Sequence, residues 1–153
     1  MYTNASWDFG HIARPDNVCS NGCFGTLHIS DTRPRLTITG IVNTPAAGET
    51  LDKVGMTTGW TDGRVNHTCM DVDYPSDYIP QNVTLKCQYS VRAGSDHGDS
   101  GAAVFRNYDW PNGDHVYLYG ILGGSWNNST AEFGFSPMGS ILSTNELGPM
   151  TVY

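Results

Sequence analysis

Apolar and polar residues alternate along much of this chain, which predicts short β-strands separated by turns. Residues 35–42 alternate most clearly, as a strand with one buried face does. Residues 102–106 and 115–122 are a second likely pair, joined through Trp-Pro-Asn-Gly at 110–113, a strong turn signal. Further strands are expected at residues 24–29, 53–60, 64–72, 82–90 and 132–135, the second of these interrupted by two glycines.

A helix is expected only near the C-terminal end of the sequence. Ser136 is a suitable N-cap, Pro137 suits the first helical position, and the helix would run through Leu142 and stop near Gly148-Pro149. No internal repeat or low-complexity tract interrupts the pattern. A chain of 153 residues is one domain by length, and about six short strands indicate a small barrel or sandwich.

Composition and charge narrow the class of protein further. The sequence is 39% hydrophobic and 15% charged, with 18 glycines, which favours an all-β globular protein. A net charge of −7 argues against nucleic acid or an anionic membrane as a partner. No apolar stretch is as long as a membrane span, and no signal peptide opens the sequence, so we expect the natural chain to begin upstream of Met1.

Four cysteines allow three disulfide pairings. Cys69 and Cys87 flank a segment with a turn-rich midpoint, which suits a disulfide across a long hairpin, and Cys19 and Cys23 could close a small loop. A zinc site would need a second ligand pair, such as His-x3-His, and the sequence has none. Disulfides are therefore favoured over a metal, which implies an oxidising, extracellular setting.

Residues 98–101, Gly-Asp-Ser-Gly, carry the clearest candidate chemistry. Two glycines around a serine let the backbone turn tightly and approach a substrate carbonyl closely. The motif resembles the nucleophile loop of chymotrypsin-like serine proteases. That resemblance implies that Ser100 is the nucleophile and that the N–H groups of Gly98 and Ser100 form the oxyanion hole.

Two further segments resemble the same family. Residues 53–65 are similar to the segment that opens the second barrel in the secreted bacterial streptogrisin and α-lytic protease branch, usually Lys-x-Gly-Arg-Thr-Thr-Gly. Residues 119–125 are similar to the strand that pairs with substrate backbone. The resemblance covers roughly residues 40–150 and implies an all-β, chymotrypsin-like Greek-key barrel with a short C-terminal helix. We expect residues 1–34 to be a remnant of the first barrel and the inter-barrel connection, and residues 35–153 to be the second barrel.

The resemblance also assigns a substrate-binding region. Its expected residues lie before the nucleophile and on the later strand: Gly94, Ser95, His97, Gly123, Gly124 and Ser125. Trypsin-type enzymes carry an aspartate six residues before the nucleophile, where this sequence has glycine, so an uncharged P1 residue is expected. Acyl transfer of this kind requires no metal and no organic cofactor.

The remaining members of the catalytic triad are harder to place. Residues 5–12 resemble the stretch around the family's catalytic aspartate, which implies that Asp8 orients the histidine. The family order would put that histidine tens of residues before Asp8. His11 is too close to Asp8, and His97 is interpreted as a pocket-rim or solvent-facing side chain. The general base is thus expected from outside this chain, and its loss costs on the order of 10^6-fold in turnover.

One departure from the family concerns the aspartate before the nucleophile. The family arginine that pairs with it is replaced here by Met56, and an unpaired buried carboxylate is costly. The candidate partners for Asp99 are Arg64, Arg92 and backbone N–H groups.

Three functions were weighed on these observations. The first is a serine endopeptidase, inactive in isolation, whose partners are a peptide substrate and an N-terminal barrel. The alternative is a non-catalytic barrel that acts as a binding or interaction module, which the missing histidine favours. A metal site at Asp96, His97 and Asp99 is disfavoured, because adjacent residues on one turn rarely converge on one ion.

Overall fold

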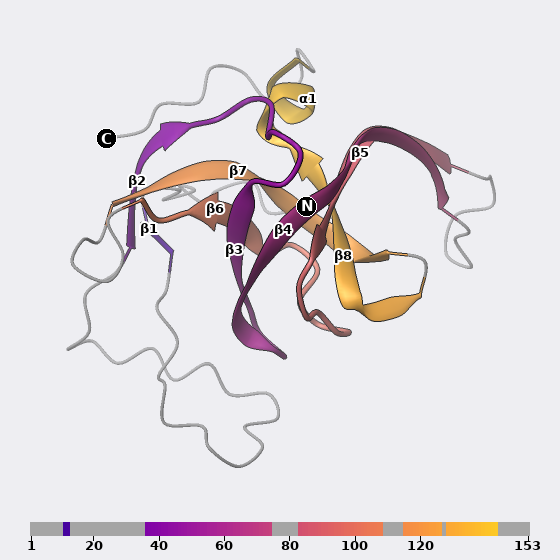
Figure 1. The fold of residues 1–153 in the computed structure, drawn as a ribbon, viewed down its shortest axis with the longest axis horizontal. Coiled ribbons are helices and arrows are strands. Elements are labelled where there is room, and N and C mark those ends of the chain that lie inside the picture. Colours follow the sequence, from indigo (N-terminus) through magenta and orange to yellow (C-terminus); the bar gives the residue numbers. More distant parts are fainter. Residues whose placement is uncertain (1–10, 13–35, 75–82, 109–114, 127, 144–153) are drawn as a thin grey trace, which may run out of the picture.

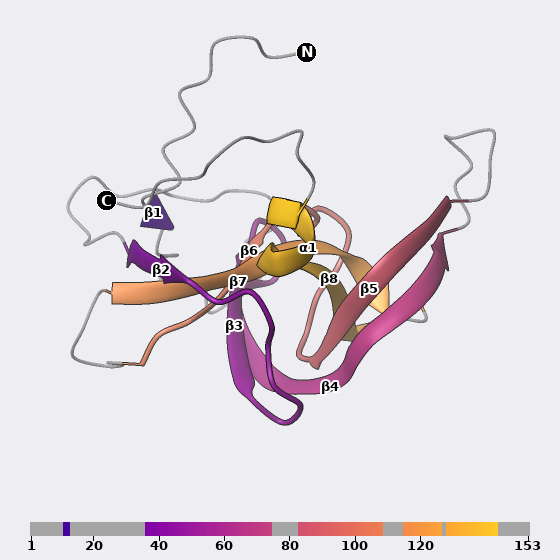
Figure 2. The same cartoon turned by 90° about the horizontal axis from the view of Figure 1, so that it is seen from above.

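The computed structural model describes residues 11–12, 36–74, 83–108, 115–126 and 128–143. These residues form eight strands and one helix: β1 (His11–Ile12), β2 (Leu36–Ile41), β3 (Thr50–Gly55), β4 (Gly59–Tyr74), β5 (Val83–Arg92), β6 (Ala103–Arg106), β7 (His115–Trp126), β8 (Ser129–Pro137) and α1 (Met138–Ser143). All pairings are antiparallel except that of β2 with β7. The hairpin of β4 and β5 projects at one end of the molecule, and β1 and β2 lie at the other (Figures 1 and 2).

The sheet closes on itself to form a barrel. Its strand order is β1-β2-β7-β6-β3-β4-β5-β8, and β7 also pairs with β8, so that the last six strands form a ring. Within the ring, β6 returns to lie beside β3 after the successive hairpin-connected strands β3, β4 and β5, which is a Greek-key arrangement. The predicted all-β Greek-key barrel is therefore confirmed, and the sandwich alternative is wrong.

Glycine makes the closure between β7 and β8 possible. Gly120 of β7 lies opposite Pro137 of β8. A Cβ at Gly120 would overlap the backbone carbonyl oxygen of Ser136 and the ring of Phe135. Only a residue without a side chain allows the two strands to approach this closely.

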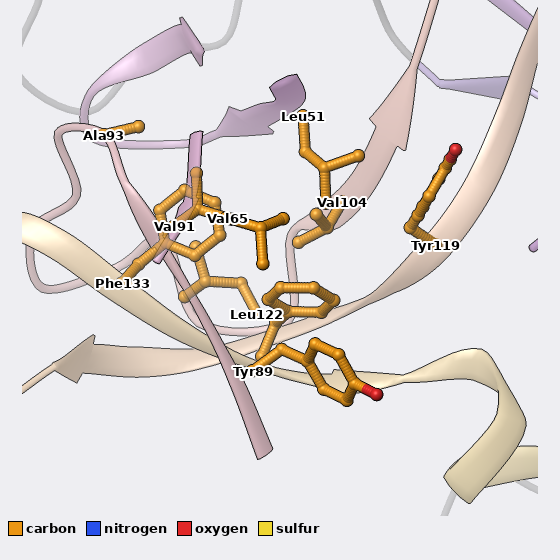
Figure 3. Packing of buried hydrophobic residues seen from close by; sticks show 10 residues of the cluster. Leu51, Val65, Tyr89, Val91, Ala93, Val104, Tyr119, Leu122 and Phe133 are labelled. Atoms are coloured by element: carbon orange, nitrogen blue, oxygen red, sulfur yellow. The ribbon is translucent and has the colours of Figure 1, made fainter. Parts of the chain in front are cut away.

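Alternating side chains of the ring strands fill the barrel interior. On β5 and β8, Tyr89, Val91, Phe133 and Phe135 turn inward and are almost fully buried. They pack together with Leu51, Val65, Ala93, Val104, Tyr119 and Leu122 (Figure 3). A second cluster holds β2 and α1 against β6 and β7, and consists of Leu36, Ile38, Phe105, Val116, Leu118 and Met138. The period of two in the sequence thus corresponds to these buried faces.

The predicted hairpin and its disulfide are present. Strands β4 and β5 pair along their length, and a disulfide joins Cys69 to Cys87 across them. Both cysteines have positive φ angles, near 50°, where the register of the two strands shifts. Cys19, Cys23, the expected strand at 24–29 and nearly all of segment 1–34 lie outside the described residues.

Two details of the predicted secondary structure are wrong. Residues 53–60 are not one strand: β3 ends at Gly55, β4 begins at Gly59, and the turn between them reverses the chain. The helix begins at Met138, because Ser136 and Pro137 are the last residues of β8 and pair with β7. Barrel closure therefore outweighs the local capping signal. The predicted helix end near Gly148 lies outside the described residues.

In the described ranges, no helix is long and apolar enough to cross a membrane.

Candidate active site

The Gly-Asp-Ser-Gly segment forms a tight loop between β5 and β6. Gly98 and Gly101 have φ angles of +100° and +88°, which residues with a side chain rarely adopt. The N–H of Asp99 donates to the carbonyl of Asp96 at 3.1 Å, and the N–H of Gly101 donates to the carbonyl of Leu122 at 2.8 Å. The loop therefore presents Ser100, which is exposed, directly beside β7.

The side chain of Asp99 turns the other way, into the protein, and is 1% exposed. Its Oδ1 accepts hydrogen bonds from the N–H groups of Thr57 (2.8 Å) and Thr58 (3.1 Å). Its Oδ2 accepts from Lys53 Nζ (2.8 Å), Thr58 Oγ1 (2.6 Å) and the N–H of Asp96 (3.2 Å). Burial by itself raises the pKa of Asp99, but the bonds from Lys53, Thr58 and Thr57 outweigh it and lower the pKa from 3.8 to about 2.

Lys53 is the cation that compensates this carboxylate. It lies on β3 with its side chain fully buried, and its ammonium also donates to Thr58 Oγ1 and, at 3.3 Å, to the carbonyl of Gly59. Burial lowers the pKa of Lys53 below its ordinary value, although the contact with Asp99 opposes that effect. The two arginines predicted as candidate partners do not make this contact, whereas the predicted backbone N–H groups do.

The β3 pattern contained a signal for Lys53. Residues of β3 alternate between half-buried and buried positions, so that Lys53 shares its inward face with Leu51 and Gly55. A Cβ at Gly55 would overlap the carboxylate of Asp99, and glycine is thus needed for the loop to pack against β3. Arg64, by contrast, is exposed and donates to the carbonyl of Gly48 at 3.4 Å.

The turn between β3 and β4 holds the nucleophile loop at a second point. Thr57 Oγ1 donates to the carbonyl of His97 at 2.6 Å, and a Cβ at Gly98 would overlap that hydroxyl. Met56, which stands where the resembled family has arginine, is 52% exposed and contributes no charge. The turn therefore binds the loop through backbone and hydroxyl groups, and the charge comes from the preceding strand.

Two N–H groups of the loop are left available. Among the described residues, neither the N–H of Gly98 nor that of Ser100 has a hydrogen-bond acceptor, and both residues are exposed. The intervening N–H, of Asp99, is engaged inside the turn. A hydroxyl flanked by two unengaged N–H donors is the arrangement that acyl transfer uses to hold a developing oxyanion.

Strand β7 has an open edge next to this loop. On that edge β6 pairs with β7 as far as Ile121, and backbone bonds from residues 101–102 extend to Leu122. In the described ranges no strand pairs with β7 on that edge beyond Leu122. Gly123 and Ser125 are exposed there, and a Cβ at Gly124 would meet nothing within 4 Å. An extended peptide could add to this edge by main-chain hydrogen bonds.

The other predicted substrate-binding residues precede the loop. The carbonyl of Gly94 accepts a hydrogen bond from Thr61 Oγ1 at 2.8 Å. Ser95 is 2% exposed, its N–H donates to the carbonyl of Thr130, and its Oγ has no partner among the described residues. His97 is exposed, as interpreted from the sequence, and no contact links its ring to Ser100 in the described part of the chain.

The structure argues against the metal hypothesis. Asp99 faces Lys53 inside the protein, whereas Asp96 and His97 are exposed. No group of three or more His, Cys, Asp or Glu side chains could hold a metal ion among the residues described. Asp8 lies outside those residues.

Sequence reasoning missed a polar cluster at the far end of β7. His67 Nδ1 lies 2.9 Å from Ser90 Oγ and 3.3 Å from Glu132 Oε1, and its ring stacks on Trp126 at 5.5 Å. The cluster fixes the residue that directly follows the open edge. Its members come from four strands, and no spacing along the sequence could have indicated it.

Comparison with known proteins identifies the fold. No family model and no curated protein matches the sequence. Among solved structures, a glutamic acid specific serine protease described as using a novel histidine triad in substrate binding matches with a TM-score of 0.57 and 24% identity, over 82% of this chain and 59% of that one. Thermobifida fusca Protease A matches with a TM-score of 0.56 and 23% identity, over 74% and 54% of the two chains. Cellulomonas bogoriensis chymotrypsin gives 0.54 and 22%, over 73% and 54%.

The fold is thus the β-barrel of the bacterial chymotrypsin-like serine proteases. The chain spans between 54% and 59% of the length of these three neighbours. At this level of identity the likeness concerns the fold, and the chemistry must be argued from the site.

Proposed function

We propose that this chain is the second barrel of a secreted serine endopeptidase of the streptogrisin-like branch, which cleaves peptide bonds through an acyl-enzyme on Ser100. The observation that carries the proposal is the loop itself: an exposed Ser100 next to two N–H groups without acceptors, beside an open strand edge. A β-barrel has no structural need for that combination.

The chemistry follows from these positions. The Ser100 hydroxyl oxygen attacks the substrate carbonyl and passes its proton to a general base, while the N–H groups of Gly98 and Ser100 hold the oxyanion. The base returns that proton to the leaving amine, and water then hydrolyses the ester by the same route. We propose that the base is a histidine supplied by an N-terminal barrel outside this chain and oriented by Asp8.

The substrate is proposed to be a peptide bound in extended form along Gly123, Gly124 and Ser125. Gly94 presents no charge at the position where trypsin-type enzymes bind basic residues, and Ser95 is neutral, so an uncharged P1 residue is preferred. The disulfide between Cys69 and Cys87 supports secretion, since such bonds persist in oxidising compartments.

One observation favours the second candidate, a non-catalytic binding module. No histidine ring contacts Ser100 within the described ranges, so the loop and the open edge would bind a peptide without cleaving it.

Labelling with a fluorophosphonate probe tests the proposal. The protein expressed from its complete gene is compared with its Ser100→Ala variant and with the 153-residue chain. Labelling of the complete protein, lost in the alanine variant and nearly absent from the chain alone, is the expected result. A folded complete protein that is not labelled would overturn the endopeptidase and leave the binding module.

A further inference from the structure

The groups that hold Asp99 in place all come from two short segments of the chain. Lys53, Thr57 and Thr58 belong to the hairpin of β3 and β4, and Asp96 belongs to the nucleophile loop. Lys53 is the one charged partner of Asp99 in the described part of the chain. The loop is therefore secured by the barrel itself.

The position of Asp99 determines where the two neighbouring N–H groups point. Asp99 stands between Gly98 and Ser100, with its own N–H bonded to Asp96 and its carboxylate bonded on both oxygens. The peptide groups on either side cannot rotate unless the carboxylate leaves its site. Because the site is buried, the carboxylate remains there only while a cation compensates its charge.

The expected source of that cation is absent, and Lys53 replaces it from another direction. Met56 takes the position of the family's arginine and is exposed on the turn, whereas Lys53 reaches Asp99 from β3 with its ammonium buried. Thr58 Oγ1 contacts both members of the pair. We infer that Lys53 is the positioning residue that keeps the oxyanion hole of this chain formed, an inference that rests on the proposed function.

A consequence follows for the chain as it stands. Since every group of this arrangement lies between residues 53 and 101, the oxyanion hole forms without an N-terminal barrel and without a general base. The chain should therefore bind an anionic group at Gly98 and Ser100 even where it cannot hydrolyse a peptide bond.

Amide NMR on the 153-residue chain tests the inference, with acetyl-Ala-Ala-Pro-Ala bearing a free C-terminal carboxylate as the probe. In the wild-type chain, the N–H signals of both Gly98 and Ser100, and those of residues 123–125, should shift on titration. In Lys53→Met the signals of residues 123–125 should still shift, those of Gly98 and Ser100 should not, and affinity should fall at least tenfold. A loss confined to the loop separates positioning from a general structural role.

Two further variants make the result decisive. Lys86→Met removes a lysine from an ion pair that is mostly exposed, with Asp71, and should bind the probe like the wild type. Lys53→Gln keeps a donor of similar length without the charge, and it replaces Lys53→Met if that variant does not fold. It too should lose the shifts of Gly98 and Ser100.

The outcomes separate the two hypotheses. Unchanged shifts of Gly98 and Ser100 in a folded Lys53 variant would overturn the role of Lys53 and leave the proposed function intact. A wild-type chain in which neither the loop nor residues 123–125 respond would overturn the substrate site itself, and the inference with it.

Discussion

Acidification should destabilise this barrel through Asp99 in particular. Despite burial, its hydrogen bonds hold its pKa at about 2, below the ordinary 3.8. A carboxyl whose pKa is depressed by folding contributes stability above its unfolded pKa and loses it as the pH falls through the folded pKa. Since each pKa unit corresponds to about 1.4 kcal/mol, Asp99 contributes about 2 kcal/mol at neutral pH, lost between about pH 5 and pH 2.

Urea unfolding followed by tryptophan fluorescence from pH 2 to pH 7 measures this contribution. The wild type is compared with a Lys53→Met/Asp99→Asn variant, which removes both charges and leaves no unpaired buried ion. Between pH 5 and pH 2 the wild type should lose about 2 kcal/mol more than the variant does. Glu49 and Glu132, whose pKa values are also lowered, are present in both proteins and cancel in the comparison.

The control is a carboxylate in an exposed ion pair. Hydrogen bonding to Lys86 lowers the pKa of Asp71, but the pair lies in solvent, so Asp71→Asn should leave the pH profile nearly unchanged. Parallel profiles for the wild type and the double variant would refute the reasoning, since Asp99 would then not be held in its charged form by these contacts.

Two other predictions concern the barrel itself. Replacing Cys69 and Cys87 by serine opens a loop of 18 residues and should cost about 3 kcal/mol, measured as the free energy of unfolding; an unchanged value would contradict the hairpin as described. Gly120→Ala places a methyl group against the carbonyl oxygen of Ser136 and should destabilise by about 2 kcal/mol or more in thermal unfolding. Gly124→Ala, with nothing within 4 Å of the added atom, is its control and should change stability by less than about 0.5 kcal/mol; equal effects of the two would rule out the tight closure.

Local patterns carried most of the fold. Strands β5 and β7 follow the period of two along the sequence, and the cysteine spacing around a turn-rich segment predicted the bond between Cys69 and Cys87. The two glycines around Ser100 predicted a tight loop, and both have the positive φ angles that such a loop requires. The catalytic role of Ser100 remains a prediction, and Asp8 lies outside the described residues.

Errors arose where a distant contact outweighed a local preference. Ser136 and Pro137 have the character of a helix start, yet β7 recruits both into β8. The partner of Asp99 was sought among arginines, which are the usual partners of carboxylates, whereas the structure supplies a lysine 46 residues earlier in the chain.

The sequence by itself determined which residues face inward, where the chain turns and which loop can present a nucleophile, because these depend on side-chain period and on the conformational freedom of glycine. Only the tertiary structure decided that Lys53 meets Asp99, that β7 closes the barrel with β8, and that β7 keeps an open edge beside Ser100. Each of these is a contact between segments far apart in the chain, and its energy depends on burial and distance, which exist only once the barrel has formed.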